Sequence, residues 1–254
     1  MNDLSLKQRN ETAQIEVFAT AQAASEAVAE KILAAVRKKP KAVLGLATGQ
    51  TPRRVYAKLI EAVNAGQISF SEAETFNLDE YCGLSAAHPD SFAAYMQREL
   101  FGHADFNPAK INLINGAASD MQAEAQRYAR RLTEKRIDLQ LLGIGTNGHI
   151  GFNEPGSASD SRVSIVDLSD ETLKANRPTL IELEDVPHQA ITMGIGDILD
   201  AREIVILATG AAKAEAVRRS IEDAPSVSCP ASYLSAHGNV HWVLDSEAAA
   251  LLGR

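Results

Sequence analysis

Residues 44–52 read Leu-Gly-Leu-Ala-Thr-Gly-Gln-Thr-Pro, an apolar run that passes through a glycine turn into polar residues. The apolar part predicts a buried strand, and Thr51 and Pro52 predict the N-cap and the first residue of a helix. Free backbone N–H groups collect at such a helix start, where they can bind a phosphate or a carboxylate. An ordinary capped helix explains the same residues, so the segment alone leaves both interpretations open.

The order of strand, turn and helix recurs along the chain. Short apolar runs predict strands, and amphipathic stretches between several of them are long enough for crossover helices. This alternation predicts an α/β fold: one domain over residues 1–254, with a largely parallel, Rossmann-like sheet flanked by helices on both faces. Such sheets bind ligands at the carboxyl ends of their strands. The expected strands are 42–46, 75–78, 111–113, 139–144, 163–166, 190–193, 204–208 and 240–244, and the expected helices are 22–38, 51–64, 91–101, 120–134 and 212–222.

Composition excludes several classes of protein. Apolar residues make up 45% of the 254 residues and charged residues 23%, which is typical of a compact globular chain. The formal charge of −8 leaves no basic excess to neutralise a nucleic acid backbone. No apolar run approaches the roughly 18 residues that span a bilayer. Cys82 and Cys229 lack the spacing of a zinc site or a disulfide scaffold. We therefore expect a cytoplasmic protein with no metal, membrane or nucleic acid partner.

A second segment of interest is Phe-Asn-Leu-Asp-Glu-Tyr at residues 76–81, which places two adjacent carboxylates at the end of an expected strand. The simplest explanation of such a pair is that both carboxylates are exposed to solvent. If Asp79 instead faces a cleft close to another acid, desolvation raises its pKa toward that of a general base.

The third segment, residues 143–155, reads Gly-Ile-Gly-Thr-Asn-Gly-His-Ile-Gly-Phe-Asn-Glu-Pro and contains a GxGxxG pattern. The residues that follow are too rich in Gly, Asn and Pro to open the long helix of a dinucleotide site. We interpret the glycines as bringing the backbone close to a small ligand. A single histidine is more often structural, but Asn147 and Glu154 share the loop of His149 and could orient and charge its imidazole.

The fourth segment, residues 204–213, reads Ile-Val-Ile-Leu-Ala-Thr-Gly-Ala-Ala-Lys and repeats the order of strand, glycine and helix. Lys213 is either a solvated surface charge or, if it points back to the strand ends, a partner for a bound phosphate. The sequence therefore contains two loops of the kind that bind phosphate.

Three of these segments, at 44–52, 76–81 and 143–156, together resemble the glucosamine-6-phosphate deaminases. The similarity continues through residues 166–172, 190–195 and 210–218, in the same order and spacing. The resemblance implies an enzyme without a cofactor that isomerises an aldose to a ketose and releases ammonia, converting glucosamine 6-phosphate and water to fructose 6-phosphate.

The resemblance also implies roles for individual residues. Asp79 moves a proton between C2 and C1, and His149, supported by Glu154, assists opening of the sugar ring. Asn147 stands where the longer branch of the family has an aspartate. The residues implied to hold the phosphate are Thr48, Gly49, Gln50, Thr51 and Lys213.

Some positions depart from the family pattern. Gln50 replaces a small Gly or Ser in the phosphate loop, where its side chain either adds a donor or crowds the site. Pro178 takes the place of a phosphate-binding arginine, and Arg177 is the candidate to replace it from one position away. Ser164 stands where the hexameric branch has an effector-binding arginine. We therefore expect no activation by N-acetylglucosamine 6-phosphate, and a monomer or small homo-oligomer.

Three other functions compete with the main prediction. A neighbouring amino sugar phosphate such as galactosamine 6-phosphate would use the same residues. The 6-phosphogluconolactonases share a similar phosphate loop and Gly-His segment, but residues 150–155 and Tyr81 follow the deaminase pattern. A sensor that binds a sugar phosphate without turnover would have no need to keep Asp79, His149 and Glu154 together.

Overall fold

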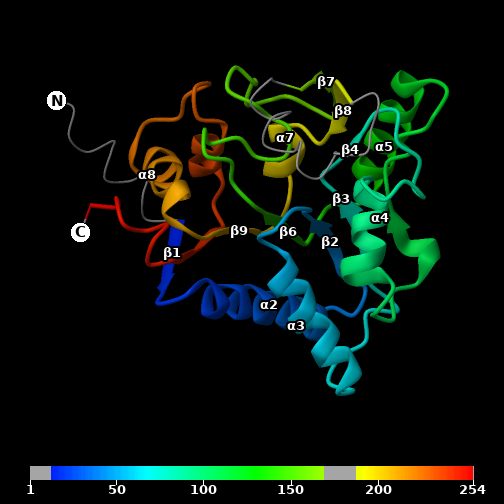
Figure 1. Ribbon diagram of the computed structural model, residues 1–254, viewed down its shortest axis with the longest axis horizontal. Coiled ribbons are helices and arrows are strands. Elements are labelled where there is room, and N and C mark those ends of the chain that lie inside the picture. The colour runs from blue at the N-terminus through cyan, green and yellow to red at the C-terminus, as the bar shows by residue number, and fades with distance from the viewer. Residues whose placement is uncertain (1–12, 169–186, 254) are drawn as a thin grey trace.

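The computed structural model describes residues 13–168 and 187–253 (Figure 1). Its main sheet has seven strands in the order β1-β10-β9-β6-β2-β3-β5, and all the paired strands run parallel. This confirms the predicted α/β fold with a largely parallel sheet. The strands are β1 (Ala13–Phe18), β2 (Val43–Leu46), β3 (Glu74–Asn77), β5 (Ile111–Asn112), β6 (Leu139–Leu142), β9 (Ile204–Ala208) and β10 (Val240–Asp245).

Helices cover both faces of this sheet, because parallel neighbours need crossover connections. In Figure 1, α2 and α3 lie below the central strands, while α7 and α8 lie above them. The first of these, α2, buries Ala24, Val28, Ile32 and Val36, the four positions that its sequence spacing predicts. The helices are α2 (Ala21–Lys38), α3 (Arg53–Asn64), α4 (Phe92–Met96), α5 (Met121–Glu134), α7 (Ile195–Leu199) and α8 (Ala214–Glu222), with a π-helical segment η1 (Gln97–Phe101) and the 3-10 helices η2 (Pro108–Lys110), η4 (Ala211–Lys213) and η5 (Pro230–Ala236).

A second, antiparallel sheet of three strands was not predicted. It has the order β4-β8-β7, with β4 (Asp79–Tyr81), β7 (Ser164–Asp167) and β8 (Gln189–Thr192). The predicted strands 163–166 and 190–193 belong to it. The sequence Asp-Glu-Tyr carries no strand signal of its own, and β4 forms because its backbone pairs with β8. The strand β1, also missed, does alternate apolar and polar residues, which is the ordinary signal of a half-buried strand.

The start of α3 differs from the prediction by one residue. The helix begins at Arg53, and the carbonyl of Pro52 accepts the N–H of Tyr56 at 2.9 Å, so Pro52 is the cap residue and Thr51 lies in the preceding turn. No side chain caps this helix end. The φ of −74° at Pro52 suits both the cap and the first helical position. The presence of a proline therefore could not locate the start of the helix to one residue.

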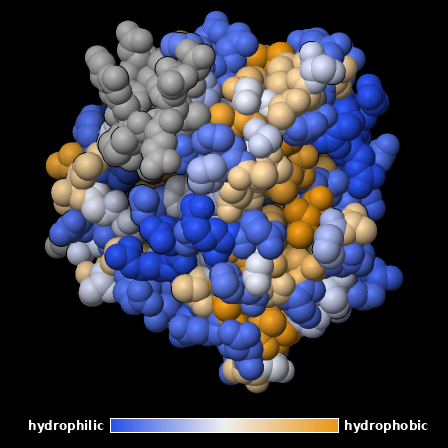
Figure 2. All heavy atoms as spheres, turned by 45° about the vertical axis from the view of Figure 1, so that its right-hand side comes forward, coloured by the Kyte–Doolittle hydropathy of each residue, from blue (hydrophilic) through white to orange (hydrophobic). Residues whose placement is uncertain are grey.

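The surface is mainly polar and the interior is apolar. Figure 2 shows hydrophilic residues over most of one face, with smaller hydrophobic patches between them. Strands β2, β6, β9 and β10 are buried along their whole length. Within residues 13–168 and 187–253, no helix has the length and the apolar composition needed to cross a membrane.

Candidate active site

A cavity of about 510 Å³ opens at the carboxyl ends of the central strands. It is lined by the segments that follow β2, β3, β6 and β9, and by residues of α4 and η1 on one side. This is where parallel sheets place their ligand sites. The cavity thus lies at the strand ends, where the sequence predicts a ligand site. The predicted site residues that line the cavity are Thr48, Gly49, Gln50, Thr51, Asp79, His149 and Lys213.

The predicted phosphate loop, residues 48–51, forms one wall of this cavity. Its Gly49 has a φ of +106°, a conformation that favours glycine, so the turn depends on this residue. Two tyrosines fix the loop, since Tyr56 donates its hydroxyl to the carbonyl of Ala47 and Tyr95 donates to that of Gly49. The loop is thus held in place before any ligand arrives.

The second glycine turn contributes less than the sequence predicted. The N–H of Gly210 donates to both carboxylate oxygens of Asp245 at 3.0 Å, so this N–H is already used within the protein. Of this segment, Lys213 lines the cavity. Desolvation lowers the pKa of Lys213 from its usual value, which places a cation with little water around it at the strand ends. Such a cation binds an anion strongly.

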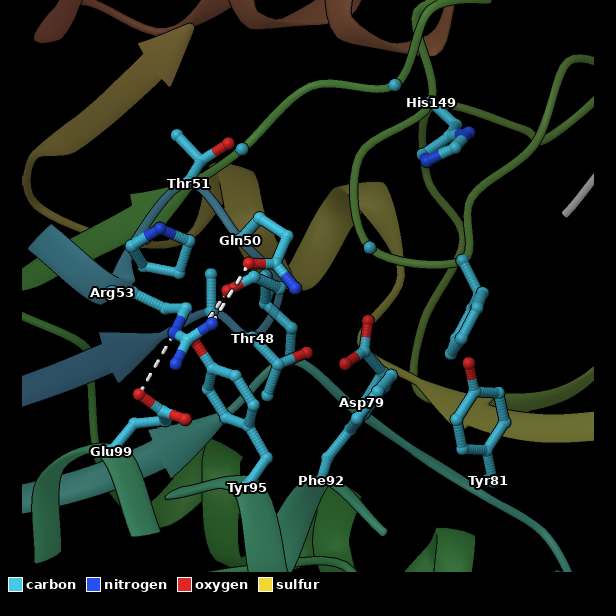
Figure 3. A pocket seen from close by; sticks show the side chains of 18 of the residues that line it. Thr48, Gln50, Thr51, Arg53, Asp79, Tyr81, Phe92, Tyr95, Glu99 and His149 are labelled. Carbon is cyan, nitrogen blue, oxygen red and sulfur yellow. Dashed lines mark hydrogen bonds and ion pairs between the residues drawn. The ribbon is translucent and has the colours of Figure 1, made fainter. Parts of the chain in front are cut away.

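Asp79 is the buried carboxylate of the cavity. The chain leaves β3 at Leu78, whose N–H donates to Leu46 and whose carbonyl accepts from Met193, and Asp79 then begins β4. Figure 3 shows its carboxylate pointing into the cavity, with Gln50 on one side and His149 on the other. Desolvation and, second, the neighbouring Glu80 raise the pKa of Asp79 to about 8.

Glu80 has a different environment from Asp79. Its carboxylate accepts the N–H groups of Tyr81, Phe92 and Ala93 at 2.8–2.9 Å, and so it holds the start of α4 against β4. Burial raises the pKa of Glu80 to about 7, although the three N–H donors oppose that shift. Of the two adjacent acids, only Asp79 lines the cavity.

His149, Asn147 and Glu154 meet in the loop after β6, as predicted. Asn147 donates its side-chain amide to Glu154 Oε2 at 2.8 Å and accepts the N–H of His149 at 3.1 Å. His149 Nδ1 lies 3.4 Å from Glu154 Oε1, close enough for an ion pair but without hydrogen-bond geometry. Asn147 therefore orients Glu154 toward the imidazole. Neither Asn147 nor Glu154 lines the cavity itself.

Two glycines let this loop approach its neighbours closely. A Cβ added at Gly145 would lie 2.3–2.5 Å from three ring atoms of His149. A Cβ at Gly151, where φ is +57°, would lie 3.0 Å from Thr192 Oγ1 and 3.5 Å from Asp79 Oδ2. Of the three glycines of the GxGxxG pattern, Gly145 alone packs against His149; a Cβ at Gly148 would meet Cys229, and one at Gly143 would meet nothing within 4 Å. Gly151 brings the loop beside Asp79.

Several residues of the cavity were missed at the sequence level. Arg53 and Arg98 line it, and the buried rings of Tyr81 and Phe152, with centroids 5.6 Å apart, form an apolar wall beside Asp79. The position of Arg53 directly after Thr-Pro was a usable signal. The predicted Arg177 lies outside the described residues. In the part of the chain that the structure describes, no group of three or more His, Cys, Asp or Glu residues could hold a metal ion.

Comparison with known proteins gives a consistent result. The family model for "Glucosamine-6-phosphate isomerases/6-phosphogluconolactonase" matches residues 16–242. A glucosamine-6-phosphate deaminase of Rhodopirellula baltica is 51% identical over 242 residues, or 95% of this chain and 96% of the relative. The solved structure of a monomeric glucosamine-6-phosphate deaminase is 42% identical, with a TM-score of 0.91 over 94% of this chain and 99% of that one. The 6-phosphogluconolactonase of Trypanosoma brucei, at 24% identity and a TM-score of 0.78 over 95% and 99% of the two chains, shares the fold.

Proposed function

Because the chain belongs to the family of glucosamine-6-phosphate isomerases and 6-phosphogluconolactonases, we propose that its cavity carries out the deaminase reaction of that family. Glucosamine 6-phosphate and water give fructose 6-phosphate and ammonia. The observation that carries the proposal is the buried carboxylate of Asp79, which faces a cavity shared with His149 and the phosphate loop.

Asp79 is the base in this proposal. In the opened sugar, it removes the proton from C2 and returns it to C1, while the aldehyde oxygen at C1 gains a proton and the amino group at C2 loses one, which leaves an imine at C2. Water adds to this carbon, and the amino group departs as ammonia. The apolar wall and the burial of Asp79 support this role, because a carboxylate with a raised pKa can both accept and return a proton near neutral pH.

His149 assists ring opening by exchanging a proton with the ring oxygen of the sugar. Glu154 Oε1 lies 3.4 Å from His149 Nδ1, and Asn147 keeps Glu154 in position beside the imidazole. This arrangement resembles other sites in which a carboxylate orients a histidine that acts as acid and base.

The phosphate of the substrate is held by Thr48, Gly49, Gln50, Thr51 and Lys213. Their backbone N–H groups and the charge of Lys213 suit a dianion. Binding energy from the phosphate then positions C1 and C2 against Asp79. Arg177 stays a prediction for this subsite.

We further propose that residues 1–254 act as one domain, in the cytoplasm, as a monomer or small homo-oligomer without a cofactor. The match over 94% of the chain to a monomeric deaminase supports the monomer. The deaminase relative at 51% identity favours glucosamine 6-phosphate over the lactone as substrate, because the lactonase likeness at 24% identity extends to the fold alone.

The test supplies glucosamine 6-phosphate, galactosamine 6-phosphate and 6-phosphogluconolactone in separate reactions, and follows ammonia, ketose phosphate and lactone hydrolysis. We expect ammonia and fructose 6-phosphate from the first substrate, and their loss in Asp79→Asn. Ammonia from galactosamine 6-phosphate alone would replace the substrate but keep the reaction. Lactone hydrolysis alone, or binding without any turnover, would overturn the proposal.

A further inference from the structure

Two basic side chains of the cavity have no role in the reaction proposed above. Besides His149, the described residues with a basic side chain that line it are Arg53, Arg98 and Lys213, and of these three the phosphate subsite uses Lys213 alone. Arg53 is the first residue of α3 and follows the phosphate loop directly. Its position and its contacts connect it to the loop residue that departs from the family pattern, Gln50.

The side chain of Arg53 is fixed by two partners. Its Nη1 donates to Gln50 Oε1 at 3.2 Å, and its Nε donates to Glu99 Oε2 at 3.1 Å (Figure 3). Glu99 also accepts Arg98 Nε at 3.1 Å through its other oxygen, and 15% of the Glu99 side chain is exposed. A largely buried carboxylate therefore holds the guanidinium in one orientation beside the phosphate loop.

This contact also fixes the amide of Gln50. Since the amide oxygen faces Arg53, the amide nitrogen points away from Arg53, and Figure 3 shows it directed toward Thr48 and Asp79. The Oε1 atom of Gln50 is thus held by Arg53, and the NH2 group of the same side chain is left on the side of the cavity. Without Arg53, either orientation of the amide would be open to it.

The charge at this rim suits an anion. The two arginines and Glu99 together carry a net charge of +1, which the carboxylate of Asp90, a further lining residue, offsets, and Lys213 adds a positive charge to the same cavity. Donors that lie beside fixed positive charge recognise phosphoryl oxygens. Gln50 alone would offer a neutral donor with a free choice of orientation.

We propose that Arg53 is a positioning and specificity residue of the phosphate subsite, which it completes by holding Gln50 with its amide nitrogen toward the phosphate. The inference rests on the phosphate subsite of the proposed function. It explains how this chain accommodates a large residue in a loop where the family has a small one: Arg53 turns that residue into a donor.

The test measures kcat and KM for glucosamine 6-phosphate, together with binding of inorganic phosphate by calorimetry, which does not depend on turnover. Arg53→Met is expected to raise KM and the Kd of phosphate about 10-fold and to change kcat less than 3-fold, the signature of lost ground-state binding. Arg54→Met is the control, since Arg54 is the next residue on α3, is exposed and does not line the cavity.

The double variant separates positioning from a general effect of charge. In a Gln50→Gly background, Arg53→Met should raise the Kd of phosphate less than 3-fold, because there is no amide left to orient. An equal effect in both backgrounds, or an Arg53→Met protein that binds phosphate as Arg54→Met does, would overturn the inference. A wild-type protein that binds phosphate but turns over no amino sugar phosphate would refute the proposed function instead, and the calorimetric comparison would still decide the role of Arg53.

Discussion

Asp79 and Glu80 are neighbours in the chain, yet their carboxylates lie on opposite sides of β4. Side chains alternate along a strand, so one acid enters the cavity while the other reaches the first N–H groups of α4. Both pKa values are raised by burial, to about 8 and about 7. The pair thus gives one acid for proton transfer and a second that holds the helix and influences the first.

Removing the carboxylate of Asp79 should abolish the reaction and stabilise the protein at alkaline pH. We expect Asp79→Asn to lower kcat by about 10³-fold, in the range of general base catalysis.

Because the pKa of Asp79 is about 8 in the folded chain against 3.8 ordinarily, the folded state keeps a proton that the unfolded chain has lost. The free energy of unfolding therefore falls as pH rises between these values, and the variant avoids this loss.

Thermal unfolding at several pH values checks this prediction. The Tm of Asp79→Asn should exceed that of the wild type at pH ~8.5, and the difference should shrink toward pH ~4, where Asp79 is protonated in both states. Near-normal turnover would remove Asp79 from its role as base. A Tm difference that grows toward acid pH would show that its folded pKa is lowered.

The charge of Glu80 should shift the acid limb of the pH profile, which the ionisation of Asp79 sets. The limb of kcat/KM is expected near pH 8, rising with pH as Asp79 ionises. Because Glu80 raises the pKa of Asp79, Glu80→Gln should move this limb to lower pH, by about 1 unit or less. The variant should also lose about 1–3 kcal/mol of stability, since the NH2 that replaces one carboxylate oxygen is a donor and would face a backbone N–H donor.

Asp90→Asn provides the control for this shift. Asp90 also lines the cavity but does not contribute to the raised pKa of Asp79. The acid limb of Asp90→Asn should therefore lie at the same pH as that of the wild type. If Glu80→Gln and Asp90→Asn give the same profile as the wild type, the coupling between Asp79 and Glu80 is absent.

Gly145 should be required for the position of His149. Gly145→Ala places a Cβ within 2.3–2.5 Å of three atoms of the imidazole, and the ring must move away. We expect kcat to fall about 10-fold or more, because a displaced acid-base group loses its geometry. Gly143→Ala is the matched control in the same loop, since a Cβ there meets nothing within 4 Å. Equal kcat values in the two variants would contradict the proposed role of His149.

Gly45 in β2 should be required for stability rather than for catalysis. Gly45→Ala puts a Cβ 2.0 Å from Oε1 of Gln140, which is fully buried in the neighbouring strand β6. We expect a loss of about 1–3 kcal/mol in the free energy of unfolding, the usual cost of overpacking. Urea unfolding measures it, with Gly238→Ala as a control because no atom lies within 4 Å of that Cβ. An unchanged unfolding midpoint would show that Gln140 can move aside.

Much of the fold follows from local sequence. The spacing of Val28, Ile32 and Val36 defines α2, and the apolar run at 204–208 matches β9 residue for residue. These predictions succeed because the order of apolar and polar side chains along a segment shows whether one face of a helix or a whole strand is buried. The strand ends, and with them Asp79 and His149, were located for the same reason.

The sequence by itself thus determined an α/β fold, the loops that carry the site, and the residue types capable of acid-base chemistry and phosphate binding. Only the tertiary structure decided that β4 pairs with β8, that Glu80 turns away from the cavity, and that Arg53 contacts Gln50 and Glu99. These relationships join segments far apart in the chain, or depend on which side of a strand faces the solvent. Local pattern encodes the periodicity of an element, whereas its neighbours are selected by packing of the whole chain.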